Sequence, residues 1–399
     1  MKKKLIIFLL AFMTIVNVPS INVYSASLDN VSFTSIRSIM MENSIDMQIA
    51  QNKLDSSRQD LKKIKDDIED IKSDISGYES TKDSLNSELG ALDSSSDSYS
   101  SDKEEIDVKL DDCESKLDEL NDSLDNYENQ KEKAQRSLKE AQMTYDKTVE
   151  NAVYSSQKSY IDYLSMLSDI ELKKGNIELK TKEAQTAKLK YDSGFLSKND
   201  YDSADTDTTD LNNELNELKS KEEIALKNLK LSLGINQDSN ITLSNDLEAD
   251  FNAVLSIDYE KDLNEMLENN ADIRLLNMQI DWAEDDEEDS DDDDDYEDYS
   301  LENNELSLDK KYISTEIDFK EKYNNLINAY NSLKSSYDKV KTKQESYALN
   351  GRKYSFGFVS KNDLEQSKLD LDKEESSFNS ARNQFYLNYL DYIQMKEGY

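Results

Sequence analysis

Two stretches of eleven residues repeat each other in this sequence: Tyr191-Asp-Ser-Gly-Phe-Leu-Ser-Lys-Asn-Asp-Tyr201 and Tyr354-Ser-Phe-Gly-Phe-Val-Ser-Lys-Asn-Asp-Leu364. Seven of the eleven positions are identical when Tyr191 is aligned with Tyr354, and Leu196 is matched by another apolar residue, Val359. Internal repetition fixes the architecture of a chain before any single element is assigned. We therefore predict a protein built from two related halves.

Each copy has the chemistry of a tight turn between two helices. In the first copy, Gly194 suits the left-handed conformation that ends a helix. Ser197 can accept a backbone N–H at the start of the next helix, and Asp200 completes a Ser-x-x-Asp capping box. The same roles fall to Gly357, Ser360 and Asp363 in the second copy.

Any helical hairpin needs such a turn, so a purely structural role would account for one copy. Repetition of Phe-apolar-Ser-Lys-Asn-Asp indicates in addition that the exposed tip binds something. The candidate docking residues are Gly194, Phe195, Leu196, Ser197 and Asp200 in the first copy and Gly357, Phe358, Val359, Ser360 and Asp363 in the second.

The composition favours long helices over a large compact core. Hydrophobic residues make up 36% of the 399 residues and charged residues 34%, and the single proline is Pro19. Because proline costs roughly 3 kcal/mol inside a helix, its scarcity is typical of long uninterrupted helices. The sequence predicts an all-α fold of long antiparallel helices in two tandem repeats, with one inserted coiled-coil hairpin.

The segment 1–25 has the pattern of a secretory signal peptide. Lys2 to Lys4 form a basic start, and the apolar run from Leu5 to Val16 is shorter than the roughly 20 residues that span a bilayer. This pattern predicts an exported protein. No other stretch predicts a membrane span. The formal net charge of −38 argues against nucleic-acid binding, which relies on cationic side chains.

Few residues are suited to catalysis or metal binding. The chain has no histidine and one cysteine, Cys113, which lies on an apolar helical stripe and is predicted to be packed. Carboxylates are the only abundant reactive groups, and most lie on solvated helix faces. We therefore predict no enzyme activity, no metal site and no cofactor.

The two halves also share a beginning, since Met40–Met47 recurs as Met266–Ile273. The predicted organisation is a first repeat over 26–234, a connector over 235–257 and a second repeat over 258–399. A single helix is predicted over Val31–Leu54. In the second repeat, a helix entered at Asp258 is predicted to pass through Leu275 and Ile280 to Trp282.

The first half carries an insertion with a heptad pattern, which the second half lacks. Apolar residues keep a 3,4 spacing on both sides of a serine-rich loop at Ser94–Asp102, which predicts an antiparallel coiled-coil hairpin over about 54–145. Arms of about 38 residues would project roughly 57 Å. The apolar positions are Leu54, Leu61, Ile64, Ile68, Ile71 and Ile75 in one arm and Ile106, Leu110, Cys113, Leu117, Leu120, Leu124 and Tyr127 in the other.

The second half carries an acidic run instead. Glu284–Asp295 has eleven acids in twelve residues, and it predicts a solvated loop over 284–299 because like charges repel. A calcium loop of the EF-hand type would need spaced ligands and a central glycine, which this run lacks. We favour loose condensation of cations over a specific site.

The tip motif, the duplicated halves and the Leu233-Gly234 ending together resemble the TolC-like outer membrane efflux family. Its turn reads Tyr-x-x-Gly-apolar-apolar-Ser-x-x-Asp, which Tyr191–Asp200 and Tyr354–Asp363 match. The resemblance implies a homotrimer enclosing a hollow α-barrel, whose tips dock a membrane-fusion adaptor and, through it, an inner-membrane pump. The sequence departs from the family at 54–145 and 284–299, where the family has pairs of membrane-crossing strands.

Two functions follow from these features. The first is a non-enzymatic conduit component of an efflux or secretion assembly in the cell envelope, which docks an adaptor through both tips. The alternative is a secreted coiled-coil protein that serves as a structural or cell-wall-associated spacer. The hairpin fits both functions, whereas the duplicated tip is required only by the first.

Overall fold

The computed structural model describes residues 30–244, 247, 253–288 and 299–399. The predicted signal peptide at 1–25 and residues 289–298 of the acidic run lie outside this part. The elements are β1 (Asn30–Val31), η1 (Phe33–Ser35), α1 (Ile36–Asn43), α2 (Ile45–Gly90), α3 (Tyr99–Asp192), α4 (Lys198–Ser232), β2 (Thr242–Leu243), η2 (Ala253–Ser256), α5 (Tyr259–Asn269), α6 (Ala271–Glu288), α7 (Ser300–Ser355) and α8 (Lys361–Lys396). Since α6 ends at Glu288, the start of the predicted acidic loop is helical.

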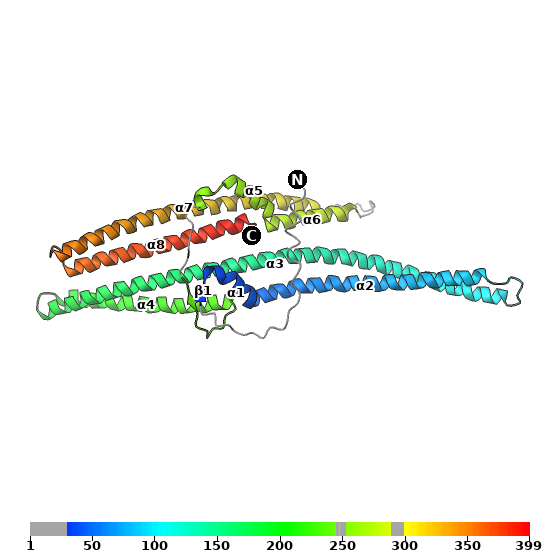
Figure 1. Ribbon diagram of the computed structural model, residues 1–399, viewed down its shortest axis with the longest axis horizontal. Coiled ribbons are helices and arrows are strands. Elements are labelled where there is room, and N and C mark those ends of the chain that lie inside the picture. The colour runs from blue at the N-terminus through cyan, green and yellow to red at the C-terminus, as the bar shows by residue number, and fades with distance from the viewer. Residues whose placement is uncertain (1–29, 245–246, 248–252, 289–298) are drawn as a thin grey trace.

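The molecule is a rod, and α3 is its longest element (Figure 1). This helix has 94 residues, which corresponds to about 140 Å at 1.5 Å per residue. It packs on α2 along its N-terminal part and on α4 along its C-terminal part. The predicted all-α fold of long antiparallel helices is confirmed.

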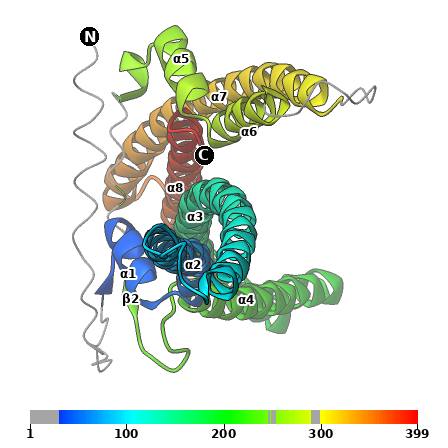
Figure 2. The ribbon, with the colours of Figure 1, turned by 90° about the vertical axis from the view of Figure 1, so that its right-hand side faces the viewer.

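The second half repeats this plan on a smaller scale. Its long helix α7 packs on α6 and on α8, as α3 packs on α2 and α4. Contacts between α3 and α8 join the two halves. Figure 2, which looks along the rod, shows α3 beside α8. No helix in the described ranges is long and apolar enough to cross a membrane.

The α2–α3 hairpin closes along the stripe that the heptads define. Leu61 and Ile68 of α2 are buried, as are Ile106 and Cys113 of α3. The Cys113 thiol donates a hydrogen bond to the carbonyl oxygen of Tyr78, at 3.2 Å. Burying such side chains contributes roughly 1.5–3 kcal/mol each, which drives the pairing of two otherwise charged helices.

The predicted single helix over Val31–Leu54 is wrong. Val31 belongs to β1, which pairs in parallel with β2 through Leu243, and the helix breaks at Ser44, where the backbone is extended. The second half breaks at the equivalent residue, Asn270, which separates α5 from α6. The predicted helix through Trp282 is therefore interrupted as well.

Two glycines pack directly against these breaks. A Cβ added at Gly234 would overlap the backbone carbonyl of Asn43, and one added at Gly398 would overlap that of Asn269. The last helix of each half thus ends directly against the break between its first two helices. Only glycine permits this close approach. At the second break the Asn270 side chain also caps α6, by accepting the N–H groups of Asp272 and Ile273 at 3.1 and 3.0 Å.

Two buried cores lie near these breaks, and the first also includes Leu387 of α8. The first core contains Val31, Tyr160 and Leu229, and the Tyr160 hydroxyl donates to the carbonyl of Val31 at 3.0 Å. The second contains Phe319 and Phe385 among other buried side chains. These cores hold α3, α4, α7 and α8 in place, so that the tips are positioned by rigid elements.

Candidate functional site

The first tip has the predicted glycine-led turn. Gly194 has φ +79°, and its N–H donates to the carbonyl of Tyr191 at 2.9 Å. The N–H of Phe195 donates to the carbonyl of Lys190 at 2.8 Å, which completes a Schellman motif at the end of α3. Satisfying these carbonyls allows the chain to reverse within a few residues.

The second tip has the same geometry. Gly357 has φ +77°, and the N–H of Phe358 donates to the carbonyl of Lys353 at 2.9 Å. Ser360 caps α8 by accepting the N–H of Asp363 at 3.1 Å, and the Asp363 carboxylate accepts the Ser360 N–H at 3.0 Å. This reciprocal capping box lowers the pKa of Asp363 through its hydrogen bonds to the Ser360 side chain and backbone.

The cap at the first tip is less complete. Ser197 accepts the N–H of Asp200 at 3.2 Å, and its hydroxyl donates to the Asp200 carboxylate at 2.7 Å. Both predicted cap pairs are therefore occupied in holding their turns. They shape the tips and leave the apolar side chains as the groups free to bind.

These apolar side chains are exposed at the apex of each tip. Phe195 is 84% exposed and Phe358 is 79% exposed, while Leu196 and Val359 are half-buried. Large apolar side chains in water indicate a binding surface when they gather at one place. The predicted residues thus divide into half-buried or capping groups and two outward-facing phenylalanines.

Both tips lie at the same end of the rod, the left-hand end of Figure 1. Lys182 of α3 and Glu365 of α8 form an ion pair of 3.4 Å near this end, which links the two hairpins. The structure thus brings the ten predicted residues into two turns at one extremity. Docking of a partner by these residues stays a prediction.

One tip residue escaped the sequence analysis. Phe356 is 76% exposed, and its ring centroid lies 6.5 Å from that of Phe358. The equivalent position in the first tip is Ser193, so the repeat gave no signal there. Comparing the two copies for differences, rather than identities, would have found it. The second tip presents two exposed phenylalanine rings where the first presents one.

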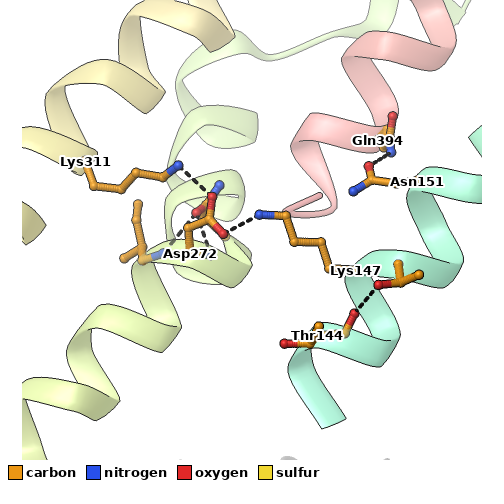
Figure 3. Close-up of polar contacts among 9 residues, drawn as sticks. Thr144, Lys147, Asn151, Asp272, Lys311 and Gln394 are labelled. Carbon is orange, nitrogen blue, oxygen red and sulfur yellow. Dashed lines mark hydrogen bonds and ion pairs between the residues drawn. The ribbon is translucent and has the colours of Figure 1, made fainter. Parts of the chain in front are cut away.

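A polar cluster far from the tips fastens the two halves to each other (Figure 3). The Asp272 carboxylate, at the start of α6, accepts from Lys147 of α3 at 2.5 Å and from Lys311 of α7 at 2.6 Å. Nearby, Gln394 of α8 donates to Asn151 of α3 at 3.0 Å. The cluster therefore connects four helices from both halves.

Ion pairing and burial shift the pKa of Asp272 in opposite directions. Partial burial raises the pKa of Asp272, but the hydrogen bonds from Lys147 and Lys311 outweigh it and hold the pKa below its ordinary value. Sequence analysis did not find this cluster, because the pairing depends on how the halves pack. Within the described residues, no group of three potential ligand side chains is placed to hold a metal ion.

Comparisons with known proteins bear on the fold. No protein-family model matches the sequence, and a search of curated proteins gave no match. The solved structure of the outer membrane protein VceC from Vibrio cholerae is 10% identical, with 92% of this chain and 96% of that chain covered and a TM-score of 0.51. The outer-membrane channel OprN is 10% identical, with 92% and 90% covered and a TM-score of 0.54. At this identity the likeness shows the fold, and the chain has the TolC-like fold that its repeated tips predict.

Proposed function

We propose that the protein is a non-enzymatic conduit component of an export assembly in the cell envelope. Copies of the chain assemble as a homotrimer, and the tips dock the helical hairpin of a membrane-fusion adaptor that is coupled to a pump. The TolC-like fold and the channel nature of OprN support this proposal. The protein is exported through the signal segment at 1–25.

The observation that carries the proposal is the pair of matched tips at one end of the rod. Each tip holds its turn through its own glycine and serine, so the exposed phenylalanines are not needed to close it. Keeping Phe195, Phe356 and Phe358 in water is unfavourable for an isolated protein. Their exposure is consistent with a partner that covers them.

A binding measurement tests the proposal. The purified membrane-fusion adaptor is passed over the immobilised protein, either wild type or carrying Phe195→Ser, Phe356→Ser and Phe358→Ser together. Losing aromatic anchors at the centre of an interface weakens binding at least roughly tenfold. The matched control is Leu255→Ser, which removes a side chain that is 70% exposed on η2.

If the triple variant bound the adaptor as tightly as the wild type, the proposal that the tips dock the adaptor would be contradicted. A rod that binds no adaptor and stays monomeric would favour the alternative, a secreted spacer. In that case the α2–α3 hairpin would be the functional element.

A further inference from the structure

The ion pair between Lys147 and Asp272 has an equivalent pair of residues elsewhere in the duplicated chain, and these two residues are not paired with each other. Asp272 corresponds to Asp46 when Met266–Ile273 is aligned with Met40–Met47, and Lys147 corresponds to Lys310 in the alignment of the tips. In the chain, Lys147 and Asp272 join the two halves. Asp46 and Lys310 have kept the same residue types, yet both are exposed and, among the described residues, neither forms an ion pair.

The surroundings of Asp46 also correspond to those of Asp272. A groove of about 620 Å³ lies between α2 and α3 at Asp46. Three of its lining residues are equivalents of residues that line the Asp272 site: Asp46 for Asp272, Thr148 for Lys311 and Ala152 for Thr315. Threonine replaces the lysine of the same half, and among the described residues Asp46 forms no ion pair within its own half.

One wall of the Asp272 site comes from the other half of the chain. Lys147 and Tyr154 of α3 supply it. Their equivalents on α7 are Lys310 and Ile317, which do not line the Asp46 groove. The groove thus shares its Asp46 end with the Asp272 site and has no counterpart of the wall that Lys147 and Tyr154 form.

The residues that would form this wall lie exposed on one face of α7. Their spacing of four, three, four, four and three residues keeps them on one side of a helix. This α7 face consists of the N-cap residue Tyr299 and of Asn303, Leu306, Lys310, Ser314 and Ile317, all exposed. Leu306 is 59% exposed and Ile317 is 61% exposed.

The equivalent face of α3 contacts the second half. It makes the contacts Arg136 with Trp282, Glu140 with Gln279, Lys147 with Asp272 and Asn151 with Gln394. The Asp46 side is similarly bare: Ile45 is 59% exposed and Ile49 is 48% exposed, whereas their equivalents Ala271 and Leu275 are half-buried.

We propose that the α7 face of one copy of this chain packs into the Asp46 groove of a second copy, with Lys310 paired to Asp46. The inference rests on the proposed assembly of copies and names the residues that hold it. The two surfaces differ, so every copy offers both and the contact is heterologous. Heterologous contacts close into a ring when the rotation between neighbouring copies divides a full turn evenly. In such a ring, the Lys310–Asp46 contact between chains repeats the Lys147–Asp272 contact inside each chain.

Zero-length cross-linking of the full chain tests the pairing. A carbodiimide couples a carboxylate to a lysine amine only where the two are in contact. Mixing ¹⁵N-labelled with unlabelled protein before coupling separates links between chains from links within one. The expected product is a mixed-isotope Asp46–Lys310 link, and the Asp272–Lys147 link within single chains is the positive control.

Charge reversal provides the second measurement. Lys310→Glu or Asp46→Lys alone should raise the dissociation constant of the assembly roughly tenfold or more, as unpaired interface charges do. The double variant should recover most of this loss. The control is Lys341→Glu, which reverses an exposed lysine of α7 about 46 Å along the helix from Lys310.

Sedimentation of the same samples, together with adaptor binding, separates the outcomes. Assembly with the mixed-isotope link and rescue by the double variant supports the inference. Assembly without the link, and without any effect of either reversal, overturns it and leaves the conduit proposal standing. A wild-type chain that stays monomeric at every concentration overturns both.

Discussion

At the scale of single residues, four glycines end the helices α3, α4, α7 and α8. Gly194, Gly234, Gly357 and Gly398 all have positive φ, and each closes a Schellman motif. Their surroundings differ. An added Cβ would meet nothing within 4 Å at the tip glycines, but would overlap backbone atoms at Gly234 and Gly398.

Alanine substitution should therefore separate the two kinds of glycine. Gly194→Ala or Gly357→Ala costs about 1–2 kcal/mol, which is the strain of the left-handed backbone. Gly234→Ala or Gly398→Ala adds a backbone clash and should cost about 2–5 kcal/mol in total. Denaturant titration measures these free energies of unfolding.

Gly175→Ala is the control for this series, since Gly175 lies within α3 and an added Cβ would meet nothing within 4 Å. It should be neutral or stabilise by about 0.5–1 kcal/mol. Equal losses at all four positive-φ glycines would contradict the packing described at the two helix breaks.

Asp272 gives a pH dependence at the same scale. Because its folded pKa lies below the ordinary value of 3.8, it stabilises the folded state above that value, and the contribution is lost as the pH falls through the folded pKa. Asp272→Asn should thus lower the melting temperature at pH 7. The gap from wild type should close below about pH 3.8.

The matched variant for that experiment is Asp281→Asn, which changes an exposed carboxylate on the same helix. It should melt like the wild type across the range. If the gap caused by Asp272→Asn persisted at pH 2, the lysine contacts would not be its cause.

At the scale of elements, the sequence predicted the features that depend on local chemistry. The tips were readable because Gly194 and Ser197 act within their own turns, and the hairpin because its heptads recur. The breaks at Ser44 and Asn270 were missed, although both residue types are common helix N-caps and the Asn270 side chain accepts the N–H groups of Asp272 and Ile273 at 3.1 and 3.0 Å. What the sequence could not indicate is that Gly234 and Gly398 pack against these breaks from far along the chain.

The same distinction holds for the candidate site. The ten predicted tip residues were found through repetition, and Phe356 was missed because it stands opposite Ser193. The pair Lys147–Asp272 was missed for another reason. Its existence depends on how α3 and α6 meet, which no local pattern encodes.

The α2–α3 hairpin should be separable from the rest of the chain. Its arms face each other, and Lys72 pairs with Glu128 across it at 2.9 Å. Replacing the segment 73–127 by a short glycine-rich loop should leave the melting temperature of the remainder within a few degrees. Helical ellipticity should fall in proportion to the helix removed, as circular dichroism would report.

Loss of cooperative melting in that shortened protein would show that the hairpin supports the halves. Shortening to the level of Lys82 and Glu114, which pair at 2.7 Å, provides an intermediate length for comparison. Both lengths should retain the tips.

At the scale of the whole molecule, the fold predicts an elongated particle. The 94 residues of α3 alone span about 140 Å, so small-angle scattering of the monomer should give a maximum dimension of at least that length. A compact particle of the same mass would be much shorter. A maximum dimension under about 100 Å would show that α3 folds back on itself.

The helix α3 belongs to both the α2–α3 hairpin and the α3–α4 hairpin. The two ends of the rod are therefore connected through one continuous helix. One residue inserted midway would swing the tip about 100° around the helix axis relative to the far arm. A whole inserted heptad would return it to within about 20°. Insertions in the middle of α3 therefore keep the relative orientation of the tip and the far arm only when they add about a whole heptad.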